Sequence, residues 1–181
     1  MKARPGLRVP GAWDGFELAI RAVLGQQIAV SAAVRLTGRL VAAHGERLAE
    51  PDGDLTHVFP QPEALAAADL TSLGMPRGRA ATLSAVAVAV LAATPLFDAT
   101  SGLDDAVRRL RSFRGVEEWT AQYIALRQLR EPDAFPPAGI GLTRAIASRE
   151  RRGYSISELL DRANTWRPWR AYAARHLWAS A

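Results

Sequence analysis

The sequence predicts an all-α protein with two lobes, and three observations support this fold class. Apolar residues make up 49% of the 181 residues, which is enough to form a globular core. In several segments they recur at spacings of three and four residues, as on one face of an α-helix. The sequence lacks a convincing pair of strands, with alternating β-branched residues around an Asn-Gly or Asp-Gly turn. We therefore expect about ten short helices and no sheet.

The first half of the chain alternates helical patterns with clear stop signals. Glycine and two glutamines, Gly25–Gln27, break the pattern between the first two helices, and the second of these is expected to be mostly buried. Gly74 followed by Pro76 marks the end of one element and the start of the next. The predicted elements are helices over 16–24 and 30–41, a short helix over 63–68, a turn over 69–73 capped by Asp69, and a helix over 77–93.

The second half of the chain is also helical, apart from one proline-rich loop. Asp104 and Asp105 lie in the first turn of a helix that ends in arginines, an order that suits the helix dipole. The segment 131–140 contains three prolines and is predicted to be a loop. The predicted helices cover 102–111, 118–129, 142–152, 156–163 and 168–178. We place the first lobe at 1–112 and the second lobe at 113–181.

Composition excludes several kinds of chemistry. The chain has no cysteine, which removes disulfides, thiolate nucleophiles and iron–sulfur clusters. Its three histidines are scattered, so we expect no catalytic metal or other cofactor. No apolar run reaches the ~20 residues of a membrane span, and the N-terminus lacks the apolar segment of a signal peptide. We expect a cytoplasmic monomer that does not bind membranes.

The stretch around Gly115 predicts a tight hairpin between two helices. A helix ending near Arg111 is followed by a short turn containing Gly115 and then by a helix that opens at Trp119. Glycine allows a positive φ and a close approach of the backbone. Such a turn leaves amides at a helix N-terminus available for a phosphate, which they bind without reading sequence. The net charge of +5 agrees weakly with an anionic partner.

Besides the hairpin over 110–121, several separated blocks run along nearly the whole chain: 11–17, 24–30, 73–76 with 79–80, 123–127, 132–136 and 166–173. They resemble, in order and spacing, the C-terminal helical part of the DNA-3-methyladenine glycosylase II family of the helix-hairpin-helix superfamily. The resemblance covers about residues 5–178. We expect the N-terminal α/β domain of that family to be absent from this chain.

The resemblance implies a two-lobed helix-hairpin-helix glycosylase fold and a base-excision-repair function on double-stranded DNA with damaged bases. Such an enzyme flips an alkylated purine into an aromatic pocket and hydrolyses its N-glycosidic bond. It implies a bacterial, nucleoid-associated protein. The implied sites are a wedge at Gln27, a base pocket at Trp119, Tyr123 and Trp178, phosphate-binding amides at Gly115, Val116 and Glu117, and a monovalent cation on the carbonyls of Arg111, Phe113 and Gly115.

Other residues receive simpler interpretations. Trp166 and Trp169 are expected to belong to the core, because large aromatic side chains usually do. Arg170 is either a phosphate contact or a structural one, and Asp133 is expected to cap or brace the proline loop. Lys2 is the only lysine. Because a Schiff base needs a lysine near the hairpin, we expect hydrolysis by water rather than lyase chemistry.

The sequence departs from the family at its catalytic position. The family pattern carries an aspartate where this chain has Gly139, within the run from Phe135 to Leu142. A carboxylate there would stabilise positive charge on the sugar, and its loss costs a factor of ~10²–10⁴ in rate. The hairpin also departs, with Arg114 for the usual proline and Glu117 for the second glycine. Glu117 places negative charge beside a phosphate site.

Three hypotheses remain open at this stage. The first is a glycosylase of alkylated purines, impaired by Gly139. The second is a non-catalytic protein that binds damaged DNA through the helix-hairpin-helix motif. The third is an all-α interaction protein with no nucleic-acid role. The glycine at position 139 is either native or an engineered replacement that holds uncleaved DNA.

Overall fold

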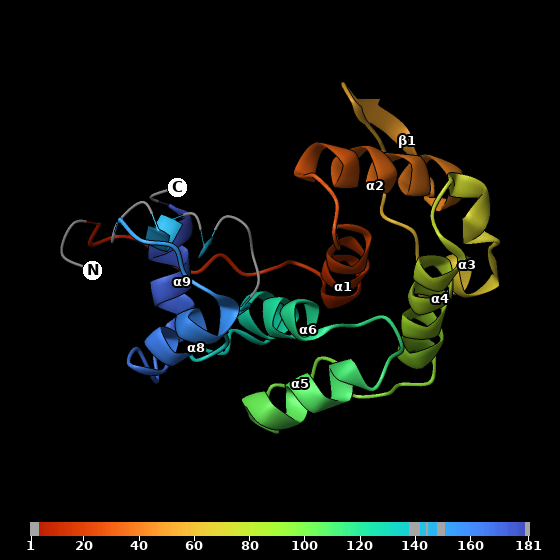
Figure 1. The fold of residues 1–181 in the computed structure, drawn as a ribbon. Coiled ribbons are helices and arrows are strands. Elements are labelled where there is room, and N and C mark those ends of the chain that lie inside the picture. The colour runs from red at the N-terminus through yellow and green to blue at the C-terminus, as the bar shows by residue number, and fades with distance from the viewer. Residues whose placement is uncertain (1–3, 138–141, 144, 148–150, 180–181) are drawn as a thin grey trace. The chain divides into compact units, whose positions relative to one another are not determined.

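The computed structural model describes residues 4–137, 142–143, 145–147 and 151–179, and they are mainly helical (Figure 1). This confirms the predicted all-α class. The chain forms two compact units. Unit 1 comprises Met1–Trp13, Phe97–Arg111 and Glu117–Ala181, and unit 2 comprises Asp14–Leu96 and Ser112–Val116. The sequence analysis drew one boundary at residue 112, whereas in the structure residues 97–111 group with the C-terminal helices, because α5 (Leu103–Arg111) packs on α6 (Glu118–Ile124).

Unit 2 is built around one long helix, α4 (Arg77–Leu91), against which two others pack. Asp14 caps the first helix by accepting a hydrogen bond of 2.7 Å from the Glu17 amide. Gly74, with φ of 77°, ends a 3-10 turn just before α4. These starts and stops agree closely with the sequence patterns. The other helical elements of the unit are α1 (Gly15–Leu24), α2 (Val30–His44), α3 (Pro62–Ala67) and η1 (Leu70–Leu73).

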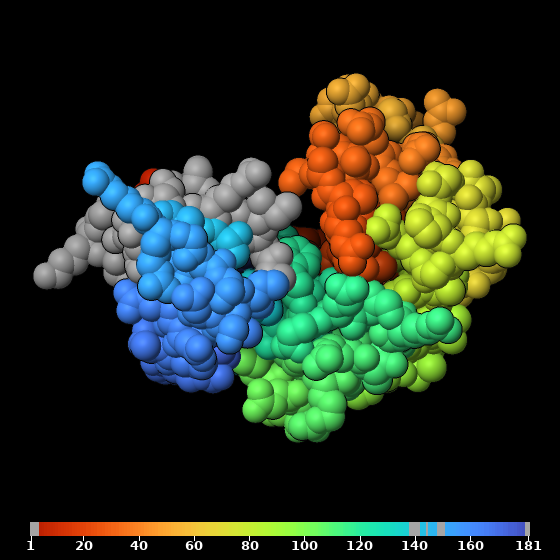
Figure 2. All heavy atoms as spheres, viewed as in Figure 1, coloured from red at the N-terminus to blue at the C-terminus, as the bar shows by residue number. Residues whose placement is uncertain are grey.

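Helix α2 corrects one expectation. Of its 15 residues only Leu36, Thr37 and Leu40 are buried, whereas the sequence analysis expected a mostly buried helix. Val30 and Val34 are 81% and 64% exposed. In the space-filling view the orange atoms of α2 lie at the surface of unit 2 (Figure 2). Apolar residues on several sides of a helix do not by themselves show which side is covered.

A small β-hairpin is a second correction, because no strands were predicted. Strand β1 (Arg47–Asp52) pairs antiparallel with β2 (Leu55–His57), and Gly53 in the turn has φ of 56°. The prediction failed because both strands are mostly exposed. Exposed strands show no alternation of apolar and polar residues, so the period-2 signal is missing. The glycine in a two-residue loop was the available signal.

Unit 1 contains α5 (Leu103–Arg111), α6 (Glu118–Ile124), α8 (Ile156–Asn164) and α9 (Arg170–Trp178). The helix predicted over 118–129 is not uniform, since α6 continues as a π-helical segment, η2 (Ala125–Leu129). The helix predicted over 142–152 is too long, because Arg151 has φ of 55° and lies in a turn. A core cluster of this unit contains Phe135, Leu142, Ala145, Ile146, Leu159, Ala163, Ala174 and Leu177.

The described helices are short. Across the residues that the structure describes, none is long and apolar enough to cross a membrane.

The N-terminus of α8 generates a prediction about stability. Ser155 accepts a hydrogen bond from the Glu158 amide, and the Glu158 carboxylate accepts from the Ser155 amide and hydroxyl. These hydrogen bonds, the backbone one first, lower the pKa of Glu158 below its ordinary value of 4.5. We expect Ser155→Ala to reduce the free energy of unfolding by about 1 kcal/mol at neutral pH.

The same variant has an expected pH signature. A lowered folded-state pKa means that the Glu158 contribution is present above pH 4.5 and is lost as pH falls through the lower value. As pH falls below 4.5, the free energy of unfolding measured with urea should therefore decrease less for Ser155→Ala than for the unchanged protein. Ser157→Ala, an exposed serine of the same helix, is the matched control. Parallel pH profiles for the unchanged protein and Ser155→Ala would contradict the prediction.

Candidate functional site

The hairpin over Ser112–Val116 is seated directly on α4. Gly115 has φ of 91°, and a Cβ placed there would lie less than 3.0 Å from the Thr82 hydroxyl oxygen. The Thr82 hydroxyl lies 2.8 Å from the Arg114 carbonyl and 2.9 Å from the Gly78 carbonyl, and it shares its single hydrogen between these two acceptors. Both the backbone angle and the closeness to α4 therefore require glycine at this position. This confirms the predicted tight turn with positive φ.

The turn between α1 and α2 is held by the hairpin and by α4. The Gln26 side chain donates a 2.9 Å hydrogen bond to the Gly115 carbonyl, and the Arg79 guanidinium of α4 donates to the Gln26 carbonyl at 2.7 Å. Gln27, the predicted wedge, is exposed and has φ of 57°. A positive φ at a residue other than glycine is uncommon. The turn is therefore a fixed structure that presents Gln27 at the surface.

The hairpin amides differ from the sequence expectation in one respect. The Val116 amide donates a 3.0 Å hydrogen bond to the Phe113 carbonyl, so it is not an unpaired donor. Glu117 has an extended backbone and precedes the first residue of α6, with no side-chain cap. The first turn of α6 thus carries amides whose partners are not supplied by a capping side chain. The phosphate role of Gly115, Val116 and Glu117 stays a prediction.

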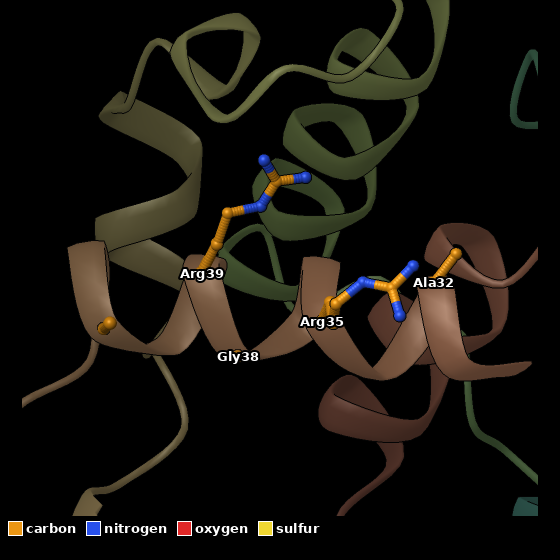
Figure 3. Close-up of a pocket in the computed structure, with 5 residues that line it drawn as sticks. Ala32, Arg35, Gly38 and Arg39 are labelled. Atoms are coloured by element: carbon orange, nitrogen blue, oxygen red, sulfur yellow. The ribbon is translucent and has the colours of Figure 1, made fainter.

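The exposed side of α2 carries positive charge. Figure 3 shows Arg35 and Arg39 projecting from successive turns of α2, with Gly38 between them. Neither guanidinium forms a salt bridge with another residue that the structure describes. They border an open depression of about 550 Å³, whose other lining residues, Ala32, Gly38 and Ala42, are small. Small side chains beside two guanidinium groups leave room for an extended anion to approach.

Two of the predicted pocket residues are stacked in unit 1. The rings of Trp119 and Tyr123 lie 5.1 Å apart between centroids at an interplanar angle of 9°. Arg127, one turn further on, donates a 2.9 Å hydrogen bond to the Tyr123 hydroxyl, and its guanidinium carbon lies 5.6 Å from the ring centroid. The Trp119 indole nitrogen is buried, and no described residue accepts from it.

Trp178, the third residue predicted to line the base pocket, lies on α9 and is partly buried against the core cluster of unit 1. Trp166 packs edge-on against Phe135 with ring centroids 6.0 Å apart, as expected for a core residue. Trp169 is 53% exposed, so the expectation that it belongs to the core was wrong. It precedes α9 and packs edge-on against Tyr172. The spacing of aromatic residues alone did not reveal which of the two tryptophans is covered.

The proline loop is braced by Asp133, as the sequence analysis expected. The Asp133 carboxylate accepts a 2.8 Å hydrogen bond from Nε of Arg170 and pairs with Arg167. Arg170 is buried, with 7% exposure, so its interpretation as a structural residue is the one that the structure supports. The Ala171 amide donates to the Pro132 carbonyl at 3.0 Å. The start of α9 therefore fixes this loop at two adjacent residues.

Helix α6 fixes the same loop from another side. The Phe135 amide donates a 3.0 Å hydrogen bond to the Gln122 side chain, which in turn donates to Glu118 at 2.9 Å. Glu118 forms a salt bridge with Arg111. Position 139, which the sequence analysis singled out, lies outside the described residues. The structure thus defines the anchoring of the loop up to Pro137 and no further.

Several of these residues could not be found from the sequence patterns. Thr82 and Arg79 contact segments about 30 and 50 residues away along the chain, and no local spacing indicates such contacts. Arg127 did have a signal, because it follows Tyr123 by four residues on one helix face. Among the described residues, no group of three or more His, Cys, Asp and Glu side chains could hold a metal ion.

Gly115 yields a quantitative prediction. Gly115→Ala should destabilise the protein by about 2–3 kcal/mol, because it combines an unfavourable positive φ with a clash against Thr82. Urea unfolding measures the difference. Gly78→Ala is the matched control, since Gly78 lies in α4 with nothing within 4 Å of an added Cβ. It should be neutral or stabilising by up to about 1 kcal/mol. Equal effects of both variants would rule out the close packing described here.

Asp133 yields a second prediction. Asp133→Asn should destabilise the protein by about 3 kcal/mol, because it leaves the buried Arg170 guanidinium without its counter-charge. Chemical denaturation at neutral pH provides the measurement. Asp161→Asn, which changes an exposed carboxylate of α8, should stay within about 0.5 kcal/mol of the unchanged protein. A loss below 1 kcal/mol for Asp133→Asn would show that the ion pair contributes no more than a surface one.

Comparison with known proteins agrees with this architecture. The chain is 39% identical over 180 residues to a probable bifunctional transcriptional activator/DNA repair enzyme AlkA of Mycobacterium tuberculosis, covering 97% of the chain and 35% of that relative. It is 39% identical over 179 residues to DNA-3-methyladenine glycosylase 2 of Escherichia coli K12, covering 97% and 61%. The chain therefore spans about a third to three fifths of these relatives.

A solved structure matches as well. The 3-methyladenine DNA glycosylase of Schizosaccharomyces pombe in complex with abasic DNA superposes with a TM-score of 0.77 at 20% identity, covering 95% of this chain and 82% of that one. At this identity the match shows the fold. The resemblance to 3-methyladenine glycosylases seen in the sequence is confirmed by these relatives. Residues 20–153 match the model of the HhH-GPD superfamily of base excision DNA repair proteins, and the chain belongs to this family.

Proposed function

We propose that this chain binds damaged duplex DNA and that its scaffold is built to release alkylated purines by hydrolysis. The observation that carries this proposal is the hairpin seated on α4, which joins the exposed Gln27 turn through the Gln26 side chain. Both features present backbone or amide groups of the kind that contact DNA without reading sequence. Arg35 and Arg39, which belong to the same unit, add guanidinium groups that could bind phosphates of the DNA backbone.

The aromatic pair supports the proposed substrate class. Trp119 and Tyr123 form a flat, stacked surface in unit 1, and Trp178 is proposed as a further wall of the base pocket. An alkylated purine carries positive charge, and a cation is attracted to an aromatic face. A nucleotide flipped out of the duplex would expose its base for stacking on an aromatic surface of this kind. Separately, Gln27 is proposed as the side chain that fills the vacated place in the duplex. The proposed partner, duplex DNA, would place the protein at the bacterial nucleoid.

The proposed reaction is hydrolysis at the sugar carbon C1′. The bond between C1′ and the base nitrogen breaks, and the bonding electron pair leaves with the base, which becomes neutral. Water forms the new bond to C1′ and releases one proton. Because Lys2 is the only lysine, no lysine near the hairpin could form a Schiff base instead. A cationic base is a good leaving group, so slow release could persist without a carboxylate at position 139.

A monovalent cation at the hairpin carbonyls is part of the proposal. The Phe113 carbonyl accepts from the Val116 amide, and the Gly115 carbonyl accepts from Gln26. A carbonyl oxygen has two lone pairs, so each keeps one for a cation. With the Arg111 carbonyl, these oxygens would supply ligands of the type that alkali cations prefer. When bound, such a cation would attract a DNA phosphate beside the hairpin.

The second candidate function is binding of damaged DNA without cleavage. The observation that favours it is the glycine at position 139, because glycine has no group to stabilise positive charge on the sugar. The hairpin, the Gln27 turn and the aromatic pair serve either function. The two candidates differ only in turnover, and both require a preference for damaged over intact duplex.

A base-release assay separates these candidates. We expect the unchanged chain to release alkylated purines from methylated duplex DNA slowly or not at all, and Gly139→Asp to be ~10²–10⁴-fold faster. Gly153→Asp is the matched control, since Gly153 has nothing within 4 Å of an added Cβ and lies outside the proposed site.

The outcomes are distinct. Release by Gly139→Asp supports the glycosylase scaffold. Tight binding of a duplex with an abasic analogue, but no release by either chain, favours the non-catalytic candidate. No binding to any duplex at low salt would reject both.

A further inference from the structure

Two adjacent glutamines follow α1, and the structure gives them different surroundings. Gln27 is exposed with a left-handed backbone, whereas the Gln26 side chain reaches the hairpin and donates to the Gly115 carbonyl at 2.9 Å. Arg79 of α4 donates to the Gln26 carbonyl at 2.7 Å. Gln26 therefore has both its backbone and its side chain fixed, and Gln27 follows it directly.

Helix α4 is the common support of these contacts. One turn beyond Arg79, the Thr82 hydroxyl donates to the Arg114 carbonyl. Gly115 lies so close to Thr82 that no side chain fits. The hairpin and the turn over Gly25–Gln27 are thus attached to the same face of α4 and to each other. All these residues belong to unit 2.

We infer that Gln26 is a positioning residue, which couples the position of the Gln27 wedge to that of the hairpin proposed to bind the DNA backbone. The inference rests on the proposed function, because it concerns how Gln27 enters duplex DNA. A left-handed φ at Gln27 is unfavourable on its own, so neighbouring contacts must hold it. The hydrogen bonds of Gln26 to Gly115 and from Arg79 fix the residue that directly precedes Gln27. Through Gln26, the position of the hairpin on the DNA backbone would therefore set the position of the side chain that enters the stack. Pre-ordering of this kind lowers the entropy cost of insertion.

The coupling makes a specific claim about binding. We expect intact duplex to be bound by the hairpin and by Arg35 and Arg39 of α2. A duplex with an abasic site should be bound more tightly, because Gln27 also inserts. Loss of the Gln26 side-chain bond should therefore reduce the preference for abasic over intact duplex, and should leave binding of intact duplex nearly unchanged. A residue that only stabilised the fold would change both affinities together or neither.

The test is a double-mutant cycle on DNA binding. The variants are Gln26→Met, which keeps the size and removes the donor, Gln27→Ala, and the combination of both. The probes are a duplex with a tetrahydrofuran abasic analogue and the matched intact duplex, titrated by fluorescence anisotropy at one salt concentration. A 2-aminopurine base beside the analogue reports unstacking. Gln61→Ala, an exposed glutamine of the same unit, is the control, and thermal unfolding of each variant verifies folding.

We expect Gln26→Met to lose about fivefold to tenfold of the abasic preference, since one hydrogen bond is lost. Its affinity for intact duplex should change less than twofold, and the 2-aminopurine signal should fall. Gln27→Ala should lose the preference too, and the double variant should match Gln27→Ala alone, because Gln26 acts through Gln27. Gln26→Ala should behave as Gln26→Met does, which checks the result if one variant folds poorly.

Other outcomes would overturn the inference. If the losses of Gln26→Met and Gln27→Ala multiply in the double variant, Gln26 acts independently of the wedge. If Gln26→Met weakens both duplexes equally, its role is only structural. Failure of the proposed function has a different signature: the unchanged chain would then show no abasic preference, before any variant is compared.

Discussion

The close approach of Gly115 to Thr82 is the constraint on which unit 2 depends. The hairpin can lie on α4 only because residue 115 has no side chain and accepts a positive φ. The Thr82 hydroxyl then reaches the Arg114 carbonyl, and the Gly115 carbonyl faces the Gln26 amide. Two segments 89 residues apart in the chain are thereby joined on one helix. These contacts also determine the position of the turn that contains Gln27.

Unit 1 has a comparable fixed point at Asp133. A carboxylate with little exposure is paired with two arginines, and one of them, Arg170, is buried. An ion pair of this kind is sensitive to the loss of one partner rather than a large net source of stability. Together with the Gln122 contact to Phe135, it holds the proline loop that leads toward position 139. The loop is thus strongly supported in a protein whose family residue at its far end is replaced by glycine.

Most helices and their ends could be predicted, because their signals are local. Asp69 caps the turn over 69–73 as predicted, Ser155 caps the helix predicted over 156–163, and Gly74 stops a turn as expected. The errors share a different cause. The exposed side of α2, the exposed Trp169 and the β-hairpin all depend on which faces the rest of the chain covers. Hydrophobic spacing records that a face is apolar and does not record what lies against it.

The sequence alone determined the family, the need for glycine at the hairpin, and the limits of the chemistry. Those conclusions depend on residue identity: one lysine, no cysteine, and Gly139 where the family has aspartate. The tertiary structure decided what each residue does. It gave Gln26 and Gln27 different surroundings, and it showed that the Val116 amide already donates to the Phe113 carbonyl. It also paired Arg170 with Asp133. Such roles arise from contacts between distant segments, and these become defined only when the chain has folded.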